Sequence, residues 1–144
     1  MPELKEFYLV GDTALSLLYG HRISVDLDLF SNSKFENNII VEALTKKFKS
    51  DFLIEQKPPQ FGIFCFINDV KIDLVRHPFE MLNPPSVIQN IRMFSKEDII
   101  AMKVQAILGR GKKKDFWDIS ELLNHFSIEN FIEFHTNKYS SQNL

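Results

Sequence analysis

The sequence contains one cysteine, Cys65, which excludes a disulfide framework and a thiolate metal cluster. Its position within the apolar residues 63–67 predicts a buried thiol. There is no apolar run of 18 residues and no signal-peptide pattern, so we expect a cytoplasmic protein without a membrane partner. The formal net charge of −2 provides no overall basic field, so any contact with nucleic acid must be local.

The composition is that of an ordinary folded domain. Of the 144 residues, 44% are hydrophobic and 25% are charged, and no repeat or low-complexity tract interrupts them. This length supports one core and is short for two, so we expect a single domain over residues 1–144. The 14 phenylalanines are expected to fill that core.

Apolar periodicity and turn residues predict a mixed α/β part followed by helices. Strands are expected at residues 6–10, 25–29, 51–56, 61–67 and 70–76. Helices are expected at residues 12–19, 35–48, 96–108 after an N-cap at Ser95, 114–125, and from Ser127 onward. Asn68-Asp69 suits a tight hairpin turn. Pro78 and Pro84-Pro85 predict a connection without regular structure, and the tail from Tyr139 is expected to fray.

A pair of acids lies on one of these strands. In Val25-Asp26-Leu27-Asp28-Leu29 the period of two places three aliphatic side chains on one face and both carboxylates on the other. Paired carboxylates with water and phosphate oxygens suit Mg²⁺. The alternative is a solvent-facing strand whose acids have no chemical role.

The residues before this strand extend the pattern. The order of strand, Gly11-Asp12-Thr13 turn, helix and D-x-D strand resembles the nucleotidyltransferase superfamily, the fold of polymerase β-like enzymes. The longer motif G-x-T-A-L-x-L-x-x-G-H-R-x-S-x-D-L-D-L-F resembles the AbiEii-type abortive-infection toxin family, a branch of that superfamily. The resemblance implies a mixed α+β fold, in which a sheet within residues 1–82 carries the catalytic residues and helices within 95–136 close the cleft.

The resemblance also implies roles for individual residues. Asp26 and Asp28 would hold Mg²⁺ or Mn²⁺, and Gly11, Asp12 and Thr13 would hold the phosphates of an NTP substrate. Arg22 and Ser24, which precede the D-x-D, match the motif R-x-S-x-D and would reach phosphate.

A third acid, Asp73, lies in the middle of a mostly apolar strand, where a carboxylate is costly unless it has a partner. By resemblance it would complete the metal triad and help to activate an acceptor hydroxyl. The alternative is an exposed acid beside Lys71.

Two helices add charged residues at positions that look inward. Lys103 falls within the apolar stripe of its helix, so it either snorkels to solvent or pairs with an anion. Asp115 and Asp118 share a face with Ile119 and Leu122. The alternative for these acids is capping of the helix N-terminus.

Residues 98–123 resemble the second conserved block of the toxin family. This likeness implies that Lys103 contacts nucleotide phosphate and that Asp118, supported by Asp115 and Lys114, holds the lysine or the acceptor site. The basic residues 110–114 are either a solvated loop or a contact for triphosphate or RNA.

The sequence departs from the family at Asp12, where glycine is usual. The turn needs a residue that tolerates positive φ, and a carboxylate there would repel a triphosphate unless a metal intervenes. The expected function is transfer of an NMP from an NTP to an acceptor such as tRNA or another RNA, in a toxin paired with an antitoxin protein. The alternatives are a catalytically inactive binding module that keeps the nucleotidyltransferase fold, and a transferase acting on a small hydroxylated molecule.

Overall fold

The computed structural model describes residues 1–139, and the remainder of the tail predicted to fray lies outside the described residues. Seven strands form one mixed sheet in the order β3-β4-β5-β2-β1-β7-β6. The strands are β1 (Tyr8–Val10), β2 (Leu27–Ser31), β3 (Phe52–Leu53), β4 (Gly62–Ile67), β5 (Val70–Arg76), β6 (Ser86–Ile88) and β7 (Ile91–Met93). The helices are α1 (Gly11–Tyr19), α2 (Asn37–Phe48), α3 (Lys96–Gly109), α4 (Lys113–Leu122) and α5 (Ile128–Lys138), with short 3₁₀ turns at Pro2–Leu4 and Lys49–Asp51. The mixed α+β class is confirmed.

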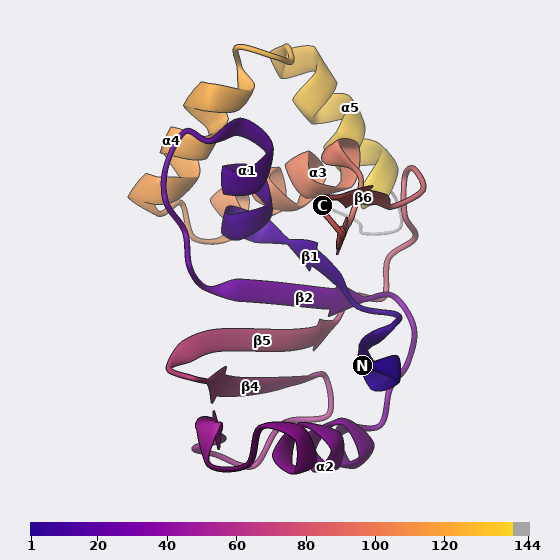
Figure 1. The fold of residues 1–144 in the computed structure, drawn as a ribbon. Helices are drawn as coiled ribbons and strands as arrows, with labels where there is room; N and C mark the ends of the chain where they lie inside the picture. The colour runs from indigo at the N-terminus through magenta and orange to yellow at the C-terminus, as the bar shows by residue number, and fades with distance from the viewer. Residues whose placement is uncertain (140–144) are drawn as a thin grey trace.

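The helices form two groups around the sheet (Figure 1). Helix α2 lies beside β4 and β3, whereas α1, α3, α4 and α5 gather beyond β1. Each group covers its own apolar cluster. Residues of β4, β5 and α2 form one cluster, residues of β1, α1, α3, α4 and α5 form the other, and Leu27 and Leu29 of β2 pack against both. Strand β2 therefore lies between the two apolar clusters and contacts both.

Local signals placed several elements correctly. Asn68 and Asp69 adopt φ of 54° and 67° and join β4 to β5 in a tight turn, as predicted. The Ser95 hydroxyl accepts a hydrogen bond from the Asp98 amide and caps α3, and Ser127 caps α5 in the same way through Asn130. Cys65 is buried, as predicted.

The predicted connection without regular structure was wrong. Residues 86–93 form the β6–β7 hairpin, whose turn residues Gln89 and Asn90 have φ of 51° and 65°. Asn at such a turn tolerates the left-handed conformation, which explains why two short strands can meet there. Strand β7 then pairs in parallel with β1 through Leu9 and Met93.

Three smaller predictions also need correction. The strand expected at residues 51–56 is reduced to the two residues of β3. Val25 and Asp26 precede β2, and the Val25 side chain is exposed rather than buried. Tyr139, expected in the frayed tail, is buried, and its ring lies 4.9 Å from that of Phe79.

A buried ion pair holds α5 against the start of α3. Lys138 Nζ lies 2.7 Å from Asp98 Oδ1, and both side chains are inaccessible to solvent. Asp98 also accepts hydrogen bonds from the Ser95 hydroxyl and the Leu82 amide. The pair therefore joins the chain segment before β6 to two helices. Across residues 1–139 no helix combines the length and apolar character needed to cross a membrane.

Removing one partner of this pair would leave a buried charge without compensation. We expect Lys138→Met to lower the free energy of unfolding by about 3–5 kcal/mol, measured by urea denaturation. The matched control is Lys46→Met on the exposed surface of α2, which should change it by no more than about 0.5 kcal/mol. A loss below about 1 kcal/mol for Lys138→Met would show that the pair contributes little.

Candidate active site

Two carboxylates face each other across neighbouring parallel strands. Asp28 of β2 is in register with Asp73 of β5, and Phe64 of β4 continues the same row. Because residues in register on adjacent strands point to the same face, the two carboxylates lie side by side. Of the three acids in the predicted triad, Asp28 and Asp73 are therefore adjacent on the sheet, whereas Asp26 lies outside it.

The turn at Gly11 closes directly onto this pair. Val10 of β1 is in register with Asp28, and a Cβ atom built on Gly11 would lie only 2.7 Å from Asp28 Oδ2. Gly11 has φ of 71°, whereas Asp12 lies in the first turn of α1 without a positive φ. The conformational requirement predicted for position 12 therefore belongs to Gly11. No side chain caps α1, so its first N–H groups remain available beside the carboxylates.

The electrostatics of the pair suit a cation. Burial, with Asp73 and Asp12 close by, raises the pKa of Asp28 to about 6. Burial also raises the pKa of Asp73, although Lys71 at 3.8 Å opposes it. Asp73 Oδ1 is buried without a hydrogen-bond partner in the described part of the chain. Oxygen ligands that share unfavourable negative charge, one of them unpaired, fit a divalent cation such as Mg²⁺.

Asp26 occupies a different position from the one predicted. It precedes β2, its side chain is exposed, and its backbone oxygen accepts a hydrogen bond from the Thr13 hydroxyl. Its charge still contributes to the raised pKa of Asp73, so the carboxylate is near the pair. Thr13 also hydrogen-bonds Ser24 at 2.8 Å, which ties the start of α1 to the segment before β2. Asp26 therefore borders the pair from the loop.

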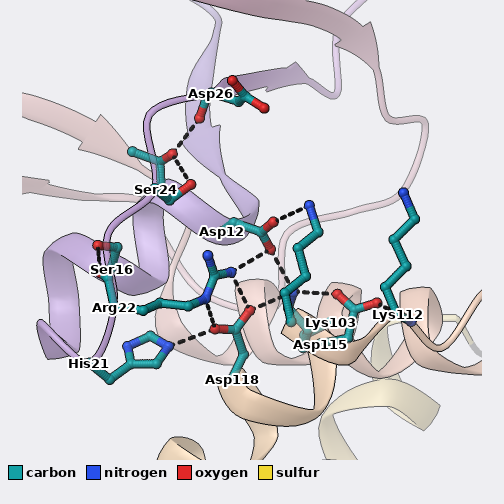
Figure 2. A network of polar contacts seen from close by, with 12 residues as sticks. Asp12, Ser16, His21, Arg22, Ser24, Asp26, Lys103, Lys112, Asp115 and Asp118 are labelled. Carbon is teal, nitrogen blue, oxygen red and sulfur yellow. Dashed lines mark hydrogen bonds and ion pairs between the residues drawn. The ribbon is translucent and has the colours of Figure 1, made fainter.

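Lys103 is the centre of a second cluster, the carboxylate cage, formed by Asp12, Asp115 and Asp118 (Figure 2). Its ammonium lies 2.7, 2.9 and 2.8 Å from oxygens of these three acids, and its side chain is only 3% exposed. Burial lowers the pKa of Lys103, but the hydrogen bonds that its ammonium donates to the carboxylates outweigh this and raise it. Lys103 therefore pairs with anions inside the protein, and the alternative that it snorkels to solvent is wrong.

The cage acids have the spacing of a metal site, since one oxygen from each lies within 4.8 Å of the others. The ammonium of Lys103 already contacts all three, and it supplies the positive charge that a metal would bring. Lys103 donates its hydrogens to carboxylates, so its predicted contact with nucleotide phosphate stays a prediction. Asp28 and Asp73 are therefore the better candidates for a cation site.

Two further side chains, Arg22 and His21, contact the cage from the loop after α1. Arg22 donates from Nε and a terminal nitrogen to the two oxygens of Asp118, at 2.8 and 2.9 Å, and also lies 3.2 Å from Asp12 (Figure 2). His21 Nε2 lies 2.6 Å from the same Asp118 carboxylate. Arg22 was predicted to reach phosphate; in this structure it orients Asp118 and spans α1 and α4.

Two of the surrounding cations reach the surface. Lys114 Nζ lies 2.7 Å from Asp12 and Arg110 Nε lies 3.2 Å from Asp115, and their side chains are 41% and 46% exposed. Burial favours the neutral forms of both acids, but these cations and Lys103 hold the pKa of Asp12 well below its ordinary value and that of Asp115 at about 2. Within the basic segment 110–114, Arg110 and Lys114 thus form ion pairs with acids of the cage.

A cavity of about 440 Å³ joins the two clusters. It lies between the sheet face and α3, and its lining includes Gly11, Asp12, Asp28, Asp73, Lys103 and Arg110. A larger cavity of about 690 Å³ lies beside the start of α2 and contains none of the predicted site residues. The smaller cavity is therefore the candidate active site. Sequence reasoning missed His77 and Tyr139 in its lining, although the alternation of Asp73, Val75 and His77 places all three on one face of an extended chain.

Gly11 provides a test of this geometry. We expect Gly11→Ala to lower the free energy of unfolding by about 1–2 kcal/mol for the left-handed backbone alone, with a further loss from contact with Asp28. The control is Gly109→Ala at the end of α3, where a Cβ atom meets nothing within 4 Å; it should be neutral or stabilising. Equal effects in urea denaturation would show that Gly11 is not conformationally required.

Lys103 provides a second test. Lys103→Met would leave three buried acids that lack their shared partner, so we expect a loss of at least about 3–5 kcal/mol. Because the pKa of the cage acids is depressed in the folded state, the stability they contribute is present above pH 4 and is lost as pH falls below it. Wild-type stability should therefore drop on acidification more steeply than that of the variant. Parallel acid-unfolding curves would contradict this account.

Comparisons with known proteins agree with this architecture. The family described as "Nucleotidyl transferase AbiEii toxin, Type IV TA system" matches residues 2–143. The "Uncharacterized protein aq_aa25" of Aquifex aeolicus (strain VF5) is 31% identical over 118 residues, which are 79% of this chain. These cover 56% of the relative, so this chain matches just over half of that protein's length.

Two crystal structures share the fold. JHP933 from Helicobacter pylori superposes with a TM-score of 0.60 at 19% identity, covering 96% of this chain and 72% of that one. ANT(2")-Ia in complex with adenylyl-2"-tobramycin superposes with a TM-score of 0.62 at 17% identity, and the match covers 94% of this chain and 87% of that one. With a family match over nearly its whole length, the chain belongs to the AbiEii nucleotidyltransferase toxin family and has a nucleotidyltransferase fold.

Proposed function

We propose that the protein is a metal-dependent nucleotidyltransferase that moves an NMP from an NTP to an acceptor hydroxyl and releases pyrophosphate. The observation that carries this proposal is the Asp28–Asp73 pair set against the Gly11 turn. The family match supports it, because members are described as nucleotidyl transferases. In this proposal residues 1–144 act as one domain, in which helices within 95–136 close the cleft over the sheet.

The residues divide the chemistry between them. Asp28 and Asp73 hold the divalent cation, and Asp26 approaches from the loop. When bound, this cation neutralises phosphate charge and stabilises the in-line transition state. The uncapped N–H groups at the start of α1 bind phosphate oxygens. Asp73 also accepts the proton of the acceptor hydroxyl.

The carboxylate cage explains how Asp12 can be tolerated at a phosphate-binding turn. Lys103, Lys114 and Arg22 all contact this carboxylate, so its negative charge is compensated within the protein. The expected repulsion of a triphosphate is thereby offset, which favours an active enzyme over an inactive binding module. Lys114 and Arg110 are exposed enough to turn toward a triphosphate at the rim of the cleft.

The acceptor belongs to one of two classes. The family description as a toxin of a type IV system favours a role opposed by an antitoxin, and for that role we propose tRNA or another RNA as the acceptor. The likeness to ANT(2")-Ia, whose complex contains adenylyl-2"-tobramycin, favours a small hydroxylated acceptor. Incubation of the purified chain with Mg²⁺ or Mn²⁺, each α-labelled NTP and tRNA, total RNA, protein or aminoglycoside would separate these classes by the species that acquires label.

Loss of either metal-holding acid should abolish transfer. We expect Asp28→Asn and Asp73→Asn each to reduce label incorporation by about a hundredfold or more, because each removes a negatively charged ligand. The matched control is Asp69→Asn in the β4–β5 turn, where Asn tolerates the positive φ, and it should stay within about twofold of wild type. Full activity in both site variants would refute the assignment of the cation site. Absence of label in every acceptor, together with no NTP binding, would refute the function.

A further inference from the structure

The inner end of the cleft contains a histidine that the proposed chemistry does not use. His77 lines the 440 Å³ cavity and is only 8% exposed. Its Nε2 is buried and has no hydrogen-bond partner within residues 1–139. A buried polar atom without a partner costs about 1–3 kcal/mol, so its persistence in a ligand-sized cavity indicates that a ligand supplies the partner.

The strand geometry places this histidine at a defined distance from the carboxylates. The His77 amide donates to the Ser31 carbonyl at 2.7 Å, which continues the β2–β5 pairing beyond Arg76. Asp73 and His77 therefore lie four residues apart on one face of an extended chain, about 13 Å along it. This separation matches the length of an extended nucleoside phosphate whose phosphates are held at Asp28 and Asp73.

The surroundings of His77 suit a flat, partly apolar ring. The centroids of the rings of Phe79, Phe30 and Tyr139 lie 4.9, 5.6 and 6.2 Å from that of the imidazole. Phe30 and Tyr139 line the same cavity, together with Met102 of α3. Aromatic rings and a methionine provide a stacking surface, and the single unpaired nitrogen provides a directional contact.

We propose that this inner end is the nucleobase pocket of the NTP and that His77 Nε2 is the contact by which the enzyme distinguishes among bases. The proposal rests on the proposed function and adds the site of base recognition to it. The ionic end of the cleft holds the triphosphate, which all four NTPs share, and the aromatic end reads the part in which they differ.

Burial makes His77 suitable for this task. Burial lowers the pKa of His77 to about 4, and the nearby Lys138 acts in the same direction, while Asp98 opposes them. The imidazole is therefore neutral at pH 7, so one of its ring nitrogens can donate and the other can accept. A neutral ring can hydrogen-bond a base edge without attracting the phosphates to the wrong end of the cleft.

The test compares binding of whole nucleotides with binding of phosphate alone. Calorimetry with the full chain and Mg²⁺ would measure affinities for the α,β-methylene analogues of ATP, GTP, CTP and UTP and for inorganic tripolyphosphate. We expect wild type to prefer at least one analogue over tripolyphosphate. His77→Phe should weaken the preferred analogue by about tenfold, the effect of one buried hydrogen bond, and leave tripolyphosphate within about twofold. The control is His125→Gln on the surface of the helical part, which should change neither.

A second variant protects the test against misfolding. His77→Gln retains hydrogen-bonding groups in a different geometry, so we expect it to change the ranking of the four analogues. An unchanged ranking, or an equal loss of analogue and tripolyphosphate binding in folded His77→Phe, would overturn the pocket assignment. Wild type that binds analogues no better than tripolyphosphate would also overturn it and would leave the proposed function standing. Wild type that binds neither would refute the proposed function itself.

Discussion

The contact of one buried ammonium with three carboxylates fixes the arrangement of this protein. Taking Lys103 out of water is unfavourable unless its hydrogens are all donated, and Asp12, Asp115 and Asp118 accept them from α1 and α4. The cage therefore joins three helices at one point. Since α1 begins with Gly11, the same contact holds that turn against Asp28 on the sheet. The position of the turn proposed to bind phosphate thus depends on a charge buried behind it, and a change in the cage would be transmitted to the proposed cation site.

The charge balance of the site follows from this arrangement. Four cationic side chains contact the three cage acids, so the cage carries no surplus of negative charge toward the cleft. The carboxylates of Asp28 and Asp73 are less fully compensated, since Lys71 approaches Asp73 only to 3.8 Å and burial raises both pKa values. Under the proposed function, a divalent cation that enters the cleft would therefore meet one favourable site rather than two competing ones. Asp12 belongs to the compensated group, which is why an acid at this turn is compatible with an anionic substrate.

Sequence reasoning succeeded where the cause was local and failed where it was not. The Asn68-Asp69 turn, the Ser95 cap and the inward face of Asp115 and Asp118 depend on residues within a few positions of each other, and the structure contains them all. The ion pairs of Lys103 do not depend on neighbours in the sequence alone, because Asp12 lies 91 residues away and only tertiary packing brings it near. The β6–β7 hairpin was missed for a similar reason, since its three-residue strands directly follow Pro84-Pro85 and β7 is stabilised by pairing with the distant β1. The strand predicted to contain both acids of the D-x-D motif begins only at Leu27, after Asp26. The Asp26 carbonyl accepts a hydrogen bond from the Thr13 hydroxyl rather than from a neighbouring strand.

The two ends of the cleft arise from one periodicity. On β2 the alternation that turns Asp28 to the cleft also turns Phe30 to it, and on β5 Asp73 is followed on the same face by Val75 and then His77. A slip of one residue in either strand would bury the acids in the core and expose Leu29 or Leu74, so the register is held by the apolar face packed beneath it. The spacing between the cation site and the aromatic end is consequently as rigid as the sheet itself. The number of residues between Asp73 and His77 on the strand therefore fixes the length of ligand that the cleft can hold. Under the proposed function, the loops and the exposed ends of Lys114 and Arg110 are the parts that can adapt to the acceptor.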